Sequence, residues 1–155
     1  MQLSEIIASN AVLPALKAGS KKQLLQELAN HAAKHAGLDA RLIFETLLQR
    51  EKLGSTGLGQ GMAIPHGKFA ALDRVQGYFA RLASPVEFEA IDDQPVDLVF
   101  LLLAPESAGA DHLKALARIS RLLRDPALVA KLRGTDDAEG LYAILTEPAS
   151  TSHAA

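Results

Sequence analysis

A length of 155 residues suits one domain with a substantial core, and 48% hydrophobic with 22% charged residues argues against wholesale disorder. The net charge of −2, without any run of lysines, argues against a nucleic-acid binder, which normally carries a basic stripe. Because cysteine is absent, disulfides, cysteine-ligated zinc and thiol catalysis are excluded.

No segment has the character of a membrane or export signal. The opening MQLSEIIASN lacks a basic stretch followed by a long apolar one, so it does not read as a signal peptide. The longest strongly apolar run, Leu98 to Ala104, is far too short to cross a bilayer. We therefore expect a soluble cytoplasmic protein without direct membrane insertion.

Two amphipathic helices are predicted in the first third of the chain. Ser20 suits the N-cap of the first helix, and Gly37 suits its C-terminal stop. Asp39 is expected to cap a second helix that ends near Lys52. The glycine-rich stretch from Gly54 to Gly61 cannot continue that helix.

Three strands are predicted in the middle of the chain. Val75 to Ala83 is rich in strand-forming residues, and Val86 to Ile91 alternates apolar and acidic residues as a half-exposed strand does. Val96 to Pro105 is apolar on both faces, which predicts the central strand, buried from both sides.

Helices return after the strands. Asp111 to Arg124 is strongly amphipathic, Asp125-Pro126 starts a short helix, and Asp136 is expected to cap a last helix through Leu145. This order predicts an α/β fold: a mixed, mainly short-stranded sheet with helices on both faces. We expect one domain over residues 1–147 and a disordered tail over 148–155.

Several familiar motifs are absent from the chain. The glycine-rich stretch contains neither a nucleotide P-loop nor a dinucleotide fingerprint, and no G-x-S-x-G nucleophile elbow occurs. His66, within Pro-His-Gly, remains as the strongest candidate for chemistry. Pro65 and Gly67 constrain and turn the backbone around it, and a neutral imidazole is a competent nucleophile. The alternative is that His66 merely completes a turn.

Two further residues are candidates for the same site. His112 falls in the first turn of its helix, on the stripe expected to face the sheet, although it could simply be a partly buried capping residue. Arg50 lies just before the glycine-rich stretch, where its guanidinium could clamp a phosphoryl oxygen or complement the helix end. Ser55 and Thr56 could donate hydroxyls to the same anion or initiate turns.

The remaining histidines carry less information. His31 and His35 have a spacing that can chelate a metal, but no third ligand is evident, so both are interpreted as surface residues. His153, in the tail, carries no inference. We expect neither a metal nor another cofactor.

The segment REKLGSTGLGQGMAIPHGK, Arg50 to Lys68, resembles the active-site segment of enzyme IIA domains of the bacterial phosphotransferase system, fructose/mannitol class. The opening LSEII, the first helix, VDLVFLLLAP and HLKALARISRLLRD follow in that family's order, over about residues 1–146. The loop and the N-terminus are most similar to the nitrogen-regulatory branch, IIA-Ntr. The resemblance implies the fold of that family.

The resemblance also implies roles for residues. His66 would accept a phosphoryl group, through Nε2, from the phosphohistidine of the carrier HPr or its nitrogen-branch counterpart. His112 would hydrogen-bond that group, Arg50 would add positive charge, and Ser55, Thr56 and Gly57 would line the phosphate pocket. The output would be regulation of targets such as a transporter or a sensor kinase. A sugar-specific IIA passing phosphate to a IIB domain, and a binding module indifferent to modification, remain alternatives.

Overall fold

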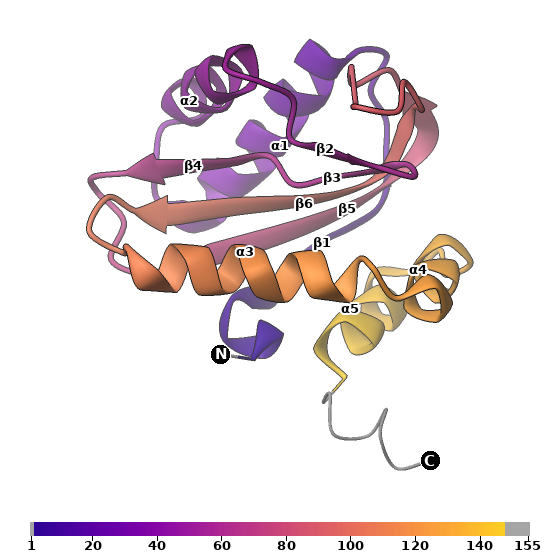
Figure 1. The fold of residues 1–155 in the computed structure, drawn as a ribbon. Coiled ribbons are helices and arrows are strands. Elements are labelled where there is room, and N and C mark those ends of the chain that lie inside the picture. Colours follow the sequence, from indigo (N-terminus) through magenta and orange to yellow (C-terminus); the bar gives the residue numbers. More distant parts are fainter. Residues whose placement is uncertain (1, 148–155) are drawn as a thin grey trace.

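A six-stranded sheet forms the centre of the computed structural model, which describes residues 2–147 (Figure 1). The strands are β1 (Ile7–Leu16), β2 (Gly57–Gly59), β3 (Met62–Ala63), β4 (His66–Phe69), β5 (Gln76–Val86) and β6 (Val96–Pro105). Their order is β1-β5-β6-β3-β2, and β4 also pairs with β6. Strand β5 runs antiparallel to β6, whereas β3 and β4 run parallel to it. The predicted α/β class with a mixed, mainly short-stranded sheet is confirmed.

Helices cover both faces of this sheet, as predicted (Figure 1). One face carries α1 (Lys21–Ala36) and α2 (Ala40–Lys52). The opposite face carries α3 (Ala110–Leu122), α4 (Pro126–Arg133) and α5 (Ala138–Thr146), and a short 3-10 helix η1 (Leu3–Glu5) precedes β1. Because both faces are covered, every residue of β6 except Asp97 is buried, which confirms β6 as the central strand.

Most of the predicted helix ends are confirmed by their caps. The Ser20 hydroxyl accepts a hydrogen bond from the Gln23 amide at 3.1 Å, and Gly37 ends α1 in the left-handed region at φ 70°. Asp125 caps α4 as predicted. The cap predicted at Asp136 is wrong by one residue: Asp137 caps α5, because its carboxylate accepts from the Gly140 amide at 2.8 Å.

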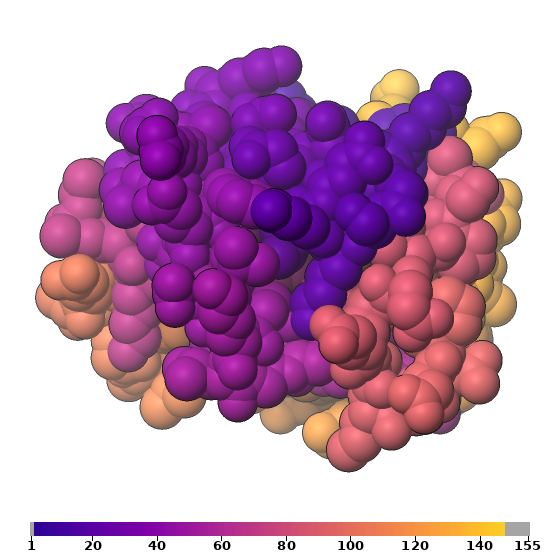
Figure 2. Space-filling view, turned by 90° about the horizontal axis from the view of Figure 1, so that it is seen from above, coloured from indigo at the N-terminus to yellow at the C-terminus, as the bar shows by residue number. Residues whose placement is uncertain are grey.

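The strand predicted over Val86 to Ile91 is wrong. Strand β5 continues through Val86, and residues 87–90 then run without strand pairing. Burial does alternate here, with Phe88 buried and Glu89 exposed, but Glu89 adopts φ 56° and the Phe88 carbonyl accepts from the Ser55 hydroxyl. On the α1–α2 side of the molecule, residues 87–95 lie beside the glycine-rich stretch (Figure 2).

The structure adds β1 and three short strands that the sequence analysis did not predict. Strand β1 is an edge strand that contains Pro14, which suits an edge because proline cannot donate to a ladder. Strands β3 and β4 pair one after the other with β6, at Met62–Leu98 and at His66–Leu102. Ile64 and Pro65 interrupt this ladder and place His66 at the start of β4.

The structure describes residues 2–147, so the tail predicted over 148–155 lies outside them. Within residues 2–147, no helix combines the length and the apolar character that a membrane crossing requires.

Candidate functional site

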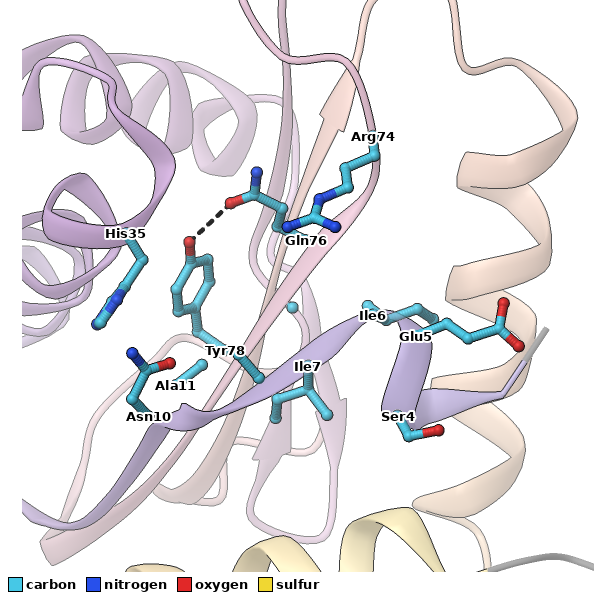
Figure 3. A pocket seen from close by; sticks show the side chains of 12 residues that line it. Ser4, Glu5, Ile6, Ile7, Asn10, Ala11, His35, Arg74, Gln76 and Tyr78 are labelled. Carbon is cyan, nitrogen blue, oxygen red and sulfur yellow. Dashed lines mark hydrogen bonds between the residues drawn. The ribbon is translucent and has the colours of Figure 1, made fainter.

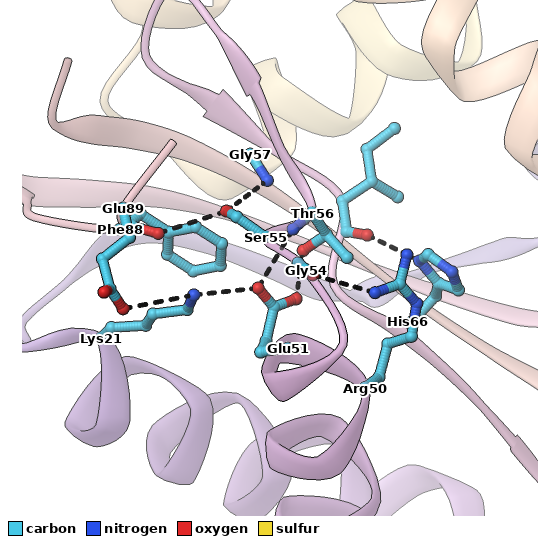
Figure 4. Close-up of polar contacts among 11 residues, drawn as sticks. Lys21, Arg50, Glu51, Gly54, Ser55, Thr56, Gly57, His66, Phe88 and Glu89 are labelled. Carbon is cyan, nitrogen blue, oxygen red and sulfur yellow. Dashed lines mark hydrogen bonds and ion pairs between the residues drawn. The ribbon is translucent and has the colours of Figure 1, made fainter. Parts of the chain in front are cut away.

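His66 is held by a backbone hydrogen bond next to the interruption between β3 and β4. Its Nδ1 lies 2.9 Å from the Ile64 carbonyl oxygen (Figure 4). A carbonyl oxygen only accepts, so Nδ1 carries the proton and donates it. In a neutral imidazole this leaves the lone pair on Nε2, the nitrogen that can act as a nucleophile. The ring is half-buried, and it lines a pocket of about 500 Å³.

The structure brings His112 to the same pocket. The ring of His112, from the first turn of α3, meets that of His66 edge-on with 5.5 Å between centroids. Its Nε2 has no hydrogen-bond partner among residues 2–147, and the side chain is buried. Burial lowers the pKa of His112, and the neighbouring His66 and then Lys68 lower it further. His112 therefore presents a neutral ring beside His66 near pH 7.

Arg50 also reaches the pocket, from the last turn of α2 (Figure 4). One guanidinium nitrogen donates to the Gly54 carbonyl at 2.9 Å, which fixes the side chain across the end of the helix. The planar guanidinium has further N–H groups for an anion. Leu53 and Lys68, which the sequence analysis did not single out, line the same pocket. Two imidazoles, of His66 and His112, and two cations, Arg50 and Lys68, thus converge on one partly open space.

Ser55, Thr56 and Gly57 are placed differently. The Ser55 hydroxyl donates to the Phe88 carbonyl at 3.2 Å and accepts from the Gly57 amide at 3.0 Å. Both the amide and the hydroxyl of Thr56 donate to the carboxylate of Glu51. None of the three is among the residues that line the His66 pocket. Their role in holding phosphate stays a prediction.

Sequence reasoning missed a buried ion pair behind the glycine-rich stretch. Glu51, 8% exposed, lies in the last turn of α2, and its carboxylate is 3.0 Å from the Lys21 ammonium (Figure 4). The ammonium also lies 4.4 Å from the centroid of the Phe88 ring. A charged residue is rarely buried unless it is paired, but the partner here is remote in sequence. No local sequence pattern therefore predicts this ion pair.

The structure corrects the interpretation of His31 and His35 as a surface pair. His35 is exposed, but His31 is half-buried. Burial lowers the pKa of His31, and the charges of His35 and Lys34 lower it further. A backbone hydrogen bond at Asn10 acts in the opposite direction. Both rings contact Tyr78, whose pKa is raised to about 12 mainly by burial. His35 and Tyr78 line a separate cleft of about 300 Å³ beside β1 (Figure 3). Among residues 2–147 no cluster of three or more potential metal ligands occurs.

Fold comparison shows that this arrangement of helices and strands is shared with a solved enzyme IIA protein. The crystal structure of mannitol IIA from Escherichia coli shares the fold, with a TM-score of 0.75 and 21% identity, over 89% of this chain and 97% of that one. The chain belongs to the family of phosphoenolpyruvate-dependent sugar phosphotransferase system EIIA 2 domains, whose family model matches residues 5–147.

Closer relatives indicate the branch within this family. The nitrogen regulatory protein of Bradyrhizobium diazoefficiens is 59% identical over 152 residues, which cover 98% of this chain and 99% of that protein. The crystal structure of nitrogen regulatory protein IIA-Ntr from Neisseria meningitidis has a TM-score of 0.88 and 40% identity, over 93% of this chain and 99% of that one. The resemblance drawn from the Arg50–Lys68 segment is confirmed.

Proposed function

We propose that the chain is a phosphoryl carrier that accepts a phosphoryl group on Nε2 of His66 and regulates target proteins by its phosphorylation state. The observation that carries the proposal is the hydrogen bond from Nδ1 to the Ile64 carbonyl. It directs the lone pair of the ring onto Nε2, the nitrogen left for attack. Membership of the phosphotransferase family supports the same chemistry.

The proposed donor is the phosphohistidine of HPr or of its nitrogen-branch counterpart. Nε2 of His66 attacks phosphorus in line; the Nε2–P bond forms as the donor's N–P bond breaks, and the electron pair returns to the donor's imidazole. His66 then carries a positively polarised ring, which the Ile64 carbonyl stabilises by keeping its hydrogen bond to Nδ1–H. Arg50 stabilises the phosphoryl oxygens, and His112 hydrogen-bonds one of them.

The proposed output is regulatory. Phosphorylation adds about two negative charges to a pocket whose charged lining residues are the cations Arg50 and Lys68, enough to change which partner it fits. Similarity to nitrogen regulatory proteins supports a regulatory endpoint over a sugar, and the targets we propose are proteins such as a transporter or a sensor kinase. These donors and targets place the proposed action in the cytoplasm.

The test is intact-mass measurement after mixing the purified protein with the phosphorylated donor. Wild type is expected to gain one phosphoryl group that is lost in acid, and His66→Ala is expected to gain none. A wild type that stays unmodified with either donor would overturn the proposal. His66→Ala and His66→Asp should also differ in binding a target; equal binding would favour a module that acts without modification.

A second candidate function follows from the family's description as a sugar phosphotransferase component. In this case the phosphorylated chain passes its group to a IIB domain of a fructose/mannitol-type permease. Phosphorylated protein is mixed with a purified IIB domain, and the mass of both is followed. Complete transfer to IIB would favour this candidate, whereas a retained phosphoryl group would favour the regulatory output.

A further inference from the structure

A continuous series of contacts runs from the buried carboxylate of Glu51 to the reactive ring of His66. Glu51 accepts from the Thr56 amide at 3.0 Å and from the Thr56 hydroxyl. The carbonyl of the same Thr56 accepts from the Ile64 amide at 3.1 Å, and the Ile64 carbonyl accepts from Nδ1 of His66. Figure 4 shows Glu51, Thr56 and His66 in this arrangement. The carboxylate therefore holds the backbone that in turn holds the imidazole.

Glu51 is itself fixed from the far side. The Lys21 ammonium is 3.0 Å from one carboxylate oxygen, and the two side chains are only 17% and 3% exposed. A pair withdrawn from water in this way is sensitive to the loss of either partner, because the other charge is left buried without compensation. Lys21 is confined in its turn by the Phe88 ring and by Glu89, whose carboxylate is 3.9 Å away.

The position of Ile64 makes this support relevant to chemistry. Ile64 is 3% exposed and precedes Pro65, at the interruption between β3 and β4. The next carbonyl, that of Pro65, accepts from the Leu102 amide of β6 at 3.0 Å, but the Ile64 carbonyl serves His66. The orientation of the Ile64 carbonyl depends on the hydrogen bond from the Ile64 amide to Thr56. If Thr56 were displaced, this carbonyl would no longer hold His66 in the Nδ1–H tautomer.

We propose that Glu51 is a positioning residue that, through Thr56 and Ile64, keeps His66 in the Nδ1–H tautomer with Nε2 free. The inference rests on the proposed function for its consequence in transfer, but the tautomer itself can be observed without a donor. Lys21 is the charge that keeps Glu51 in place. Loss of Glu51 would misplace the reacting imidazole of His66. Such a misplacement lowers the transfer rate without removing any group that touches phosphate.

The test compares Glu51→Gln with a matched control on the same helix. Gln keeps the length of the side chain but replaces one accepting oxygen with an NH₂ group, so it cannot accept from both Thr56 donors and neutralise Lys21. Glu45→Gln removes an exposed carboxylate, paired with Arg41, elsewhere on α2. Ring nitrogen chemical shifts of His66, measured by NMR on unphosphorylated protein, report the tautomer. We expect Glu51→Gln to populate the Nε2–H tautomer and Glu45→Gln to match wild type.

Transfer kinetics give the second readout. Glu51→Gln is expected to lower the maximal rate about tenfold while the donor concentration for half-maximal rate stays unchanged, since the pocket surface is intact. Thr56→Val removes only the hydroxyl bond and should act in the same direction, and Thr56→Ser should restore wild-type behaviour. These variants keep the inference testable if Glu51→Gln does not fold.

The outcomes separate the two proposals. Wild-type ring shifts and rates in both Glu51→Gln and Thr56→Val would overturn the positioning role while leaving His66 as the carrier. An altered tautomer in a protein whose wild type accepts no phosphoryl group would support the positioning role and overturn the proposed function.

Discussion

The rings of His66 and His112 meet edge-on, 5.5 Å apart and at an interplanar angle of 71°. They come from elements far apart in the chain, the start of β4 and the first turn of α3, and both line one pocket. Because each ring lies within the electrostatic reach of the other, a charge placed on one must change the protonation of the other.

Phosphorylation of His66 is therefore expected to raise the pKa of His112. In the unmodified protein, burial and then the charges of His66 and Lys68 hold that pKa below its ordinary value of 6.5. A phosphoryl group carries about two negative charges and favours the imidazolium form. NMR titration of the His112 ring, with and without phosphorylation, measures the change, and His66→Asp serves as a stable mimic. An unchanged or lowered pKa would contradict close contact between the phosphoryl group and His112.

Stability should fall as the solution is acidified through neutral pH. The pKa values of His31 and His112 are both lowered in the folded protein, so below about 6.5 the unfolded chain binds protons that the folded chain does not. Stability is fully present above that pH and is lost as the pH falls toward the lowered values. Urea unfolding at several pH values across this range measures the slope of the free energy of unfolding against pH. His112→Gln should reduce the slope, whatever its effect on stability itself; an unchanged slope would show that His112 does not contribute.

Replacing Arg50 should impair transfer more than folding. Arg50→Ala removes a guanidinium that lines the His66 pocket and is expected to lower the transfer rate on the order of 100-fold. Arg50→Lys keeps the charge but loses the planar fork of the guanidinium. Its transfer rate should therefore lie between those of wild type and Arg50→Ala. Arg41→Ala is the matched control, since Arg41 forms only an exposed pair with Glu45 on the same helix. Equal transfer rates in Arg50→Ala and Arg41→Ala would show that Arg50 has no role in transfer.

A methyl group at Gly77 should destabilise the sheet. A Cβ there would lie 2.7 Å from the Phe100 ring and 2.9 Å from the Ile6 side chain, both buried, so overpacking is expected to cost about 1–3 kcal/mol. At Gly134 the nearest atom would be 3.4 Å away and φ is −88°. Gly134→Ala should therefore stay within about 0.5 kcal/mol of wild type. Denaturant midpoints of the two variants provide the comparison.

The sequence predicts those features that local chemistry decides. Ser20, Gly37 and Asp125 mark helix ends because capping depends on a few adjacent residues, and the unbroken apolar run of β6 marks a strand covered on both faces. The pattern over Val86 to Ile91 predicts alternating burial, which the structure has, but pairing depends on partners that sequence does not name.

The site divides in the same way. His66, His112 and Arg50 are recognisable from the Pro-His-Gly motif, the helix stripe and the resemblance, and the structure places all three at one pocket. Glu51 could not be found, because its burial arises from Lys21 on another helix and Thr56 on a loop. Contacts of this kind exist only once the chain has folded.

The interruption at Ile64 and Pro65 has a consequence for turnover. Strands on both sides of it pair with β6, the most buried strand of the sheet, so His66, the proposed nucleophile, is carried by a strand anchored in the core. A donor in the proposed transfer would then meet a largely preformed surface, with little reorganisation required of this chain. In the proposed transfer, discrimination among donors and acceptors would then fall to the residues that surround the pocket, while the reactive nitrogen stays where the sheet holds it.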